Sequence, residues 1–169
     1  DADPVAVVYD GEPAPVVEPL IAELGIAHGI RVGADGGRLL DTWRQDAGID
    51  FPQPLPRPDQ LATLQYTGGT TGLPKGVNNS HGQMTVNISQ REAVLPTRLD
   101  DESILCVMPL FHVFAVAMCL HLTAYCRGKL VILPRYRPDF VFSALAEEGI
   151  TRLPAGPTIF IGLMSAEGF

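Results

Sequence analysis

The chain has 169 residues, 12 basic and 19 acidic side chains and a net charge of −7, with no lysine or arginine cluster. This balance excludes a nucleic-acid backbone as a partner, but backbone N–H groups can still bind a small anion such as phosphate. Apolar residues make up 46%, and 17 glycines and 15 prolines follow no repeat, which predicts a packed core with many loops.

The first part of the chain predicts a short α/β subregion, residues 1–50. An apolar run at 5–9 indicates a strand, and apolar residues at helical spacing then indicate a helix that stops at Gly25. A second strand at 30–32 and a short helix at 39–45 are also expected. Residues 51–60 are predicted to be an extended connector, because proline recurs there at every second position and cannot donate ladder hydrogen bonds.

From residue 61 to 169 the pattern becomes regular. Strands are expected at 61–67, 77–80, 103–108, 130–133 and 151–153, and helices at 81–94, 113–126, 139–148 and 157–165. This alternation predicts an α/β fold, a mostly parallel sheet with helices on both faces. Ligands bind such sheets beyond the carboxyl ends of the strands. The loops at 68–76, 109–112 and 155–158 are expected there.

Several residue groups have an ordinary structural interpretation. Cys106, Cys119 and Cys126 include no C-x-x-C pair, and we expect small buried core residues in a reducing compartment. The acidic run at 100–102 predicts a solvated turn. The apolar stretch at 104–125 is interrupted by proline and histidine, so no transmembrane segment is predicted. The chain start has no signal-peptide pattern, and a cytoplasmic protein is expected; peripheral membrane contact and the oligomeric state stay open.

The strongest functional signal is the segment Tyr66-Thr-Gly-Gly-Thr-Thr-Gly-Leu-Pro-Lys-Gly-Val77. Its four glycines allow close backbone approach, so that N–H groups can cradle phosphate oxygens. Threonine hydroxyls and the charge of Lys75 add to these donors. The segment lacks the Gly-Lys-Ser/Thr ending of a Walker A loop. The alternative is a flexible Gly/Thr hairpin with a surface lysine.

This segment resembles the phosphate-loop signature of the adenylate-forming superfamily, which includes acyl- and aryl-CoA synthetases, luciferases and peptide-synthetase adenylation domains. Gly68 stands where serine is commonest, which is similar to bacterial long-chain fatty-acyl-CoA ligases. His81 falls where the family has a histidine after the loop. The resemblance implies a phosphate-binding set for ATP, with Thr67 also placed to contact the ATP-bound Mg²⁺: Thr67, Gly68, Gly69, Thr70, Thr71, Gly72 and Lys75.

Two further segments extend the resemblance. Met108-Pro-Leu-Phe-His-Val113 resembles the family's aromatic motif beside the acyl carboxylate, which assigns Phe111 and His112 to the acyl site. Leu153-Pro-Ala-Gly-Pro-Thr158 resembles the next acyl-pocket loop and adds Gly156, Pro157 and Thr158, with Gly156 in place of the usual valine. Acyl chain length would then depend on the packing of Val113, Phe114, Ala117 and Met118.

The resemblance implies a ligase that uses ATP, Mg²⁺ and coenzyme A to convert a fatty acid into acyl-CoA through acyl-AMP, as part of fatty acid metabolism. An aryl- or amino-acid-activating enzyme of the same superfamily is one alternative, and a non-catalytic nucleotide-binding or packing module is another. The family's adenine motifs and lid lysine have no counterpart in these residues. We therefore expect part of the large N-terminal domain, with its catalytic residue unknown and the isolated chain inactive.

Overall fold

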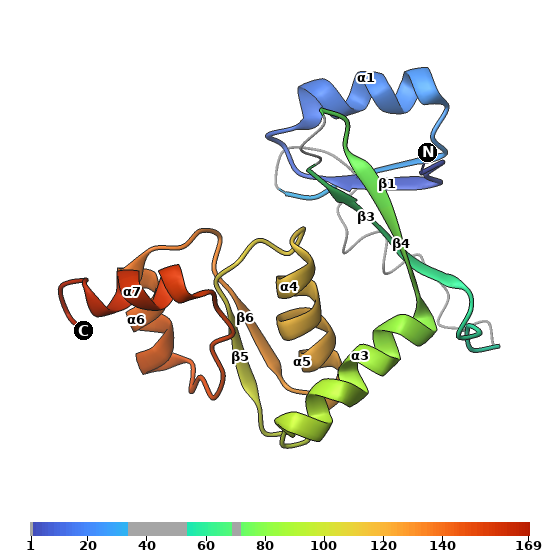
Figure 1. The fold of residues 1–169 in the computed structure, drawn as a ribbon. Coiled ribbons are helices and arrows are strands. Elements are labelled where there is room, and N and C mark those ends of the chain that lie inside the picture. The colour runs from blue at the N-terminus through green and yellow to red at the C-terminus, as the bar shows by residue number, and fades with distance from the viewer. Residues whose placement is uncertain (1, 34–53, 69–71) are drawn as a thin grey trace. The chain divides into compact units, whose positions relative to one another are not determined.

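The computed structural model describes residues 2–33, 54–68 and 72–169 (Figure 1). Contacts divide the chain into two compact units, residues 1–55 and 56–169. Some sequence predictions lie outside the described residues: the helix at 39–45, the start of the connector at 51–53, and the loop residues Gly69, Thr70 and Thr71.

The first unit is a β–α–β element. Strands β1 (Ala6–Tyr9) and β2 (His28–Arg31) pair in parallel, and α1 (Ala14–Leu24) connects them. Gly25 ends the helix with a φ of 65°, a left-handed conformation in which glycine has no side chain to clash. The strand, helix and helix stop predicted here are confirmed, with β2 starting two residues earlier than expected.

The second unit begins with an antiparallel hairpin of β3 (Leu61–Thr67) and β4 (Lys75–Ser80). Both strands were predicted, but in a mostly parallel sheet. The seven residues 68–74 between them are too few for a parallel crossover, which needs about a dozen. A Cβ at Gly76 would lie 2.8 Å from Leu64 Cδ1, so a larger residue there would require the Leu64 side chain to move.

Helix α3 (His81–Val94) has the predicted bounds because its start is encoded locally. Ser80 Oγ accepts a hydrogen bond from the Gln83 N–H at 3.3 Å, and Gln83 Oε1 accepts one from the Ser80 N–H at 2.8 Å. This reciprocal capping box satisfies two backbone donors that a helix start otherwise leaves unpaired.

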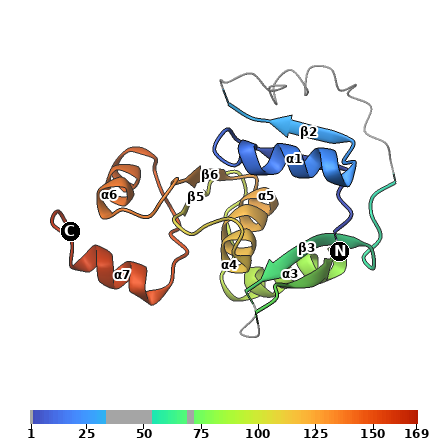
Figure 2. The same ribbon diagram turned by 90° about the horizontal axis from the view of Figure 1, so that it is seen from above.

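The core of the second unit surrounds the parallel strands β5 (Ser103–Cys106) and β6 (Lys129–Ile132). On one side lies a continuous helix made of α4 (Val113–Ala115), η1 (Val116–His121) and α5 (Leu122–Cys126). On the other lie α6 (Pro138–Glu147) and α7 (Pro157–Met164) (Figure 1, Figure 2). Ile104 and Cys106 pack with the first group, and Leu105 and Val107 pack with the second. The predicted α/β fold with helices on both faces is confirmed.

Three differences from the sequence predictions concern this core. The expected strand at 151–153 is reduced to a single parallel bridge between Ile104 and Arg152, since Pro154 has no N–H to continue a ladder. The expected helix at 113–126 contains the π-helical turn η1. The acidic turn is solvated at Asp100 and Asp101 only, because the side chain of Glu102 is buried against Arg152.

The three cysteines are buried, unpaired members of the core, as predicted. In the described part of the chain, no helix combines the length and apolar character needed to cross a membrane.

Candidate functional site

The phosphate-loop segment is the connection of the β3–β4 hairpin. Thr67 and Lys75 face each other across its base, and Thr67 Oγ1 donates to the Lys75 carbonyl oxygen at 3.3 Å. Lys75 is exposed, and Gly72 has a φ of 98°, a conformation that favours glycine. Gly68 is different, because a Cβ added there would meet nothing within 4 Å. The serine found more commonly at this position would therefore fit.

Thr67 is the residue that the resemblance assigns to the ATP-bound Mg²⁺. Its hydroxyl proton is directed to the Lys75 carbonyl, which leaves the oxygen lone pairs available to a cation. The described residues contain no cluster of three or more His, Cys, Asp or Glu side chains that could hold a metal. Mg²⁺ needs only one or two protein oxygens when nucleotide phosphates supply others. Thr67 fits such a shared site.

The second predicted segment, Phe111-His112, lies beside the hairpin. Gln65 Nε2 donates to the Phe111 carbonyl oxygen at 2.9 Å. Gln65 stands two residues before Thr67 on β3, a distance of about 7 Å along a strand. His112 caps α4, since its Nδ1 accepts a hydrogen bond from the Phe114 N–H at 3.2 Å. The Phe111 side chain is 81% exposed. The structure thus brings the base of the phosphate loop close to the predicted acyl motif.

The third predicted segment forms the start of α7. Gly156 is the residue before the helix, Pro157 occupies its first turn, and the Gly156 carbonyl accepts from the Ile159 N–H at 3.0 Å. The segment follows Arg152, which bridges to Ile104 of β5. It therefore leaves the same end of the parallel pairing as the Phe111 segment. Among the described residues, no hydrogen bond joins Gly156, Pro157 or Thr158 to the hairpin.

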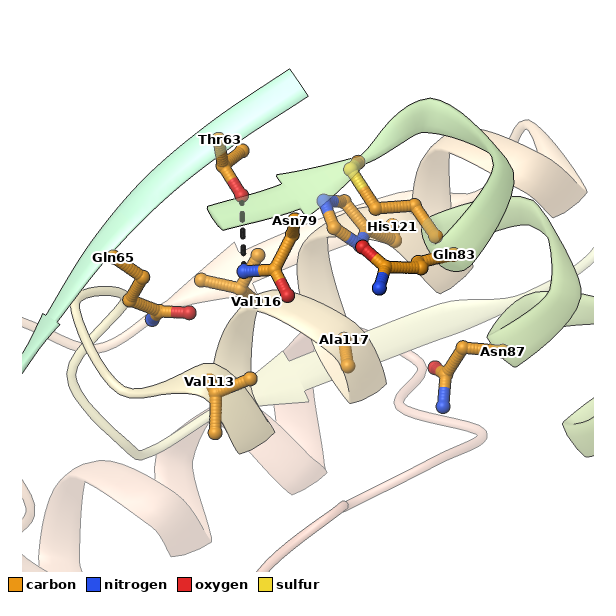
Figure 3. Close-up of a pocket in the computed structure, with 10 residues that line it drawn as sticks. Thr63, Gln65, Asn79, Gln83, Asn87, Val113, Val116, Ala117 and His121 are labelled. Atoms are coloured by element: carbon orange, nitrogen blue, oxygen red, sulfur yellow. Dashed lines mark hydrogen bonds between the residues drawn. The ribbon is translucent and has the colours of Figure 1, made fainter. Parts of the chain in front are cut away.

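A pocket of about 270 Å³ lies between the hairpin, α3 and the helix that follows His112 (Figure 3). The hairpin and α3 form one wall, which is polar except for Met84: Thr63, Gln65, Asn79, Gln83, Met84 and Asn87. The facing wall comes from the other helix and is mainly apolar: Val113, Val116, Ala117 and His121. This combination of an apolar surface with a few polar groups is typical of small-molecule sites.

Sequence reasoning named two residues of the pocket's apolar wall, Val113 and Ala117, but missed its polar wall. The available signal was the spacing of Gln83 and Asn87 on α3, because amides four residues apart share one helix face, whereas Asn79 belongs to β4. Figure 3 shows these side chains directed toward the same space, with Asn79 Nδ2 donating to Thr63 Oγ1 at 3.4 Å.

His121 introduces an ionisable group into the pocket. Burial lowers its pKa, and the nearby charge of Arg91 lowers it further. A neutral imidazole, able to donate from one nitrogen and accept at the other, is therefore favoured at neutral pH. The pocket itself presents amides, a hydroxyl and an imidazole rather than a fixed charge.

Several known proteins are similar to this chain in sequence. The model of the family described as AMP-binding enzyme matches residues 1–169. A long-chain-fatty-acid–CoA ligase of Bacillus subtilis is 32% identical over 117 residues, covering 69% of this chain and 21% of that protein. A feruloyl-CoA synthase of Amycolatopsis is 35% identical over 128 residues, covering 73% of this chain and 26% of that protein.

Solved structures show the same fold. ATP-bound MatB from Rhodopseudomonas palustris superposes with a TM-score of 0.82 at 28% identity, over 99% of this chain and 32% of that one. The N-terminal domain of FACL13 from Mycobacterium tuberculosis has a TM-score of 0.81 at 26% identity, over 96% of this chain and 40% of that one.

The chain belongs to the AMP-binding enzyme family, the adenylate-forming superfamily that contains the acyl-CoA ligases. Its fold corresponds to part of the N-terminal domain of these enzymes. It spans between a fifth and a third of the length of the first curated relatives.

Proposed function

We propose that this chain is the part of an acid–CoA ligase that binds the ATP phosphates and the acyl group. The intact enzyme would join a carboxylic acid to the α-phosphate of ATP, release pyrophosphate, and then transfer the acyl group from AMP to coenzyme A. The observation that carries this proposal is the Gln65–Phe111 hydrogen bond, which holds the phosphate-loop hairpin beside the acyl motif.

The loop's role would be electrostatic. Charge accumulates on the pyrophosphate as it leaves, and preorganised donors stabilise that charge most when they need no reorganisation. Lys75 and the backbone N–H groups of the loop would supply these donors, together with the hydroxyls of Thr70 and Thr71. Thr67 would hold Mg²⁺ jointly with the nucleotide.

For the acid itself we propose an aliphatic chain, as in fatty acid activation. Two observations support it: the apolar wall of Val113, Val116 and Ala117, and the similarity to a long-chain-fatty-acid–CoA ligase. The amides of the facing wall favour a second candidate, an aryl acid with hydroxyl or methoxy groups, since such substituents can hydrogen-bond to amides. The similarity to a feruloyl-CoA synthase supports this candidate.

ATP–pyrophosphate exchange by the intact enzyme separates these candidates. Fatty acids are expected to give acid-dependent exchange, and coenzyme A should then yield acyl-CoA and AMP. Exchange with hydroxycinnamic acids alone would select the second candidate, and exchange with amino acids alone would exclude both. A reaction without acid is the control.

The purified 169-residue chain is expected to show no exchange above a no-enzyme control with the same acids. Catalysis by positioning requires all reacting groups in one geometry, so part of a site does not give a proportional part of the rate. Titration with ATP measures the residual phosphate binding of the loop separately. Acid-dependent exchange by this chain alone would show that the chemistry needs fewer residues than proposed.

A further inference from the structure

One wall of the pocket is built on the π-helical turn η1, which interrupts the helix between α4 and α5. Val116, Ala117 and His121 of this turn line the pocket (Figure 3). A π-turn accommodates one extra residue, is rare, and occurs frequently at functional sites. The position of this wall therefore depends on contacts that stabilise the turn against ordinary α-helix.

Arg91 of α3 makes such a contact. Its Nη1 donates a hydrogen bond to the Ala117 carbonyl oxygen, inside the π-turn, and lies 3.4 Å from Met118 Sδ. The Ala117 carbonyl oxygen thus accepts a hydrogen bond from the guanidinium, while Ala117 also lines the pocket. Arg91 also follows the pocket residue Asn87 by four positions, so both lie on one face of α3. The guanidinium connects the two walls.

The contact carries an energetic cost. Within the described residues, Arg91 Nε and Nη2 are buried without hydrogen-bond partners, and burial lowers the pKa of Arg91 while Glu92 acts in the opposite direction. Buried donors without partners are unfavourable, and a well-packed apolar side chain often stabilises such a position better. Stability therefore does not explain why an arginine occupies this position. Its contact with the π-turn explains it better.

We propose that Arg91 is a positioning residue that fastens the π-turn to α3 and so sets the width of the pocket, selecting the acids that the enzyme accepts. This inference rests on the proposed function, in which the pocket receives the acyl group. It assigns Arg91 no direct contact with the reacting atoms.

The test compares Arg91→Met and Arg91→Lys in the intact enzyme, with Arg98→Met as the matched control because the Arg98 side chain is 62% exposed. Steady-state ATP–pyrophosphate exchange with a slender and a bulky acid gives KM and kcat for each. In Arg91→Met the KM of the preferred acid should rise about tenfold, the scale of pocket-shape effects. The KM for ATP and kcat should stay near wild type. Arg91→Lys should raise the KM of the preferred acid less, since the lysine ammonium can still donate a hydrogen bond to the Ala117 carbonyl oxygen.

Hydrogen exchange of residues 116–126 provides a readout independent of activity, and it should accelerate in Arg91→Met but not in Arg98→Met. If hydrogen exchange of residues 116–126 is unchanged in Arg91→Met, Arg91 does not fasten the π-turn. This result would overturn the inference even if the wild-type enzyme activates no acid and the proposed function fails. If hydrogen exchange accelerates but the KM rises by the same factor for the slender and the bulky acid, Arg91 fastens the turn without selecting between acids. This result would overturn its role in substrate selection. If Arg91→Met does not fold, Arg91→Lys decides the matter, with a smaller KM rise for the preferred acid expected.

Discussion

Replacing Thr70 or Thr71 by valine in the intact ligase is expected to lower kcat/KM about ten- to a hundredfold. Valine nearly preserves the shape of threonine but removes one hydroxyl donor. A hydrogen bond to a charged group contributes about 1.5–3 kcal/mol, and each 1.4 kcal/mol corresponds to a factor of about ten in rate. The loss should appear in kcat, because the donors act on charge that develops as pyrophosphate leaves.

The matched control is Thr85→Val on α3. Thr85 is exposed, and its hydroxyl donates only to helix carbonyls, at 3.1 Å from His81 and 3.0 Å from Gly82. It should leave kcat/KM near the wild-type value. The kcat/KM of all three variants is measured by ATP–pyrophosphate exchange at saturating acid. Wild-type kcat/KM in both loop variants would remove the loop hydroxyls from the mechanism.

The second large effect concerns stability: Glu102→Gln is expected to lower the free energy of unfolding at pH 7 by about 3 kcal/mol. The Glu102 carboxylate is 2% exposed and lies 3.0 Å from Arg152 Nη2. It also accepts hydrogen bonds from the Arg98 N–H and the Thr151 hydroxyl. A neutral amide loses the charge that Arg152 needs and cannot accept all of these bonds.

The pH dependence of this effect follows from the pKa of Glu102. Burial raises the pKa, but the hydrogen bonds from Arg152, Thr151 and the Arg98 backbone outweigh it and lower the pKa from 4.5 to about 2. The folded carboxylate therefore binds its proton less readily than the unfolded one. Its stabilising contribution is complete above about pH 4.5 and is lost as pH falls toward 2.

Urea unfolding at pH 7 and at pH 3 measures this dependence. The difference between wild type and Glu102→Gln should be largest at pH 7 and smaller at pH 3. Glu148→Gln is the control, because its ion pair with Lys129 is about half exposed and should contribute less than about 1 kcal/mol. Equal effects of the two substitutions would contradict a special role for the buried carboxylate.

Sequence alone was sufficient where the determining interactions are local. The capping box at Ser80 and Gln83 involves residues three positions apart, and α3 starts where these residues predict. Gly25 likewise ends α1 through its own backbone conformation. The loop signature from Tyr66 to Val77 indicated the family because its chemistry is contained in one short segment, and the family match confirms it.

Only the tertiary structure decided what depends on residues distant in sequence. Glu102 was expected in a solvated turn beside Asp100 and Asp101, but Arg152, fifty positions later, makes its burial favourable. The single bridge at Arg152 and the hydrogen bond from Arg91 to the π-turn also join residues that are far apart in the sequence. The pocket also depends on tertiary structure. Sequence periodicity predicts the hairpin and the two helices that line it one at a time, and only packing brings them face to face.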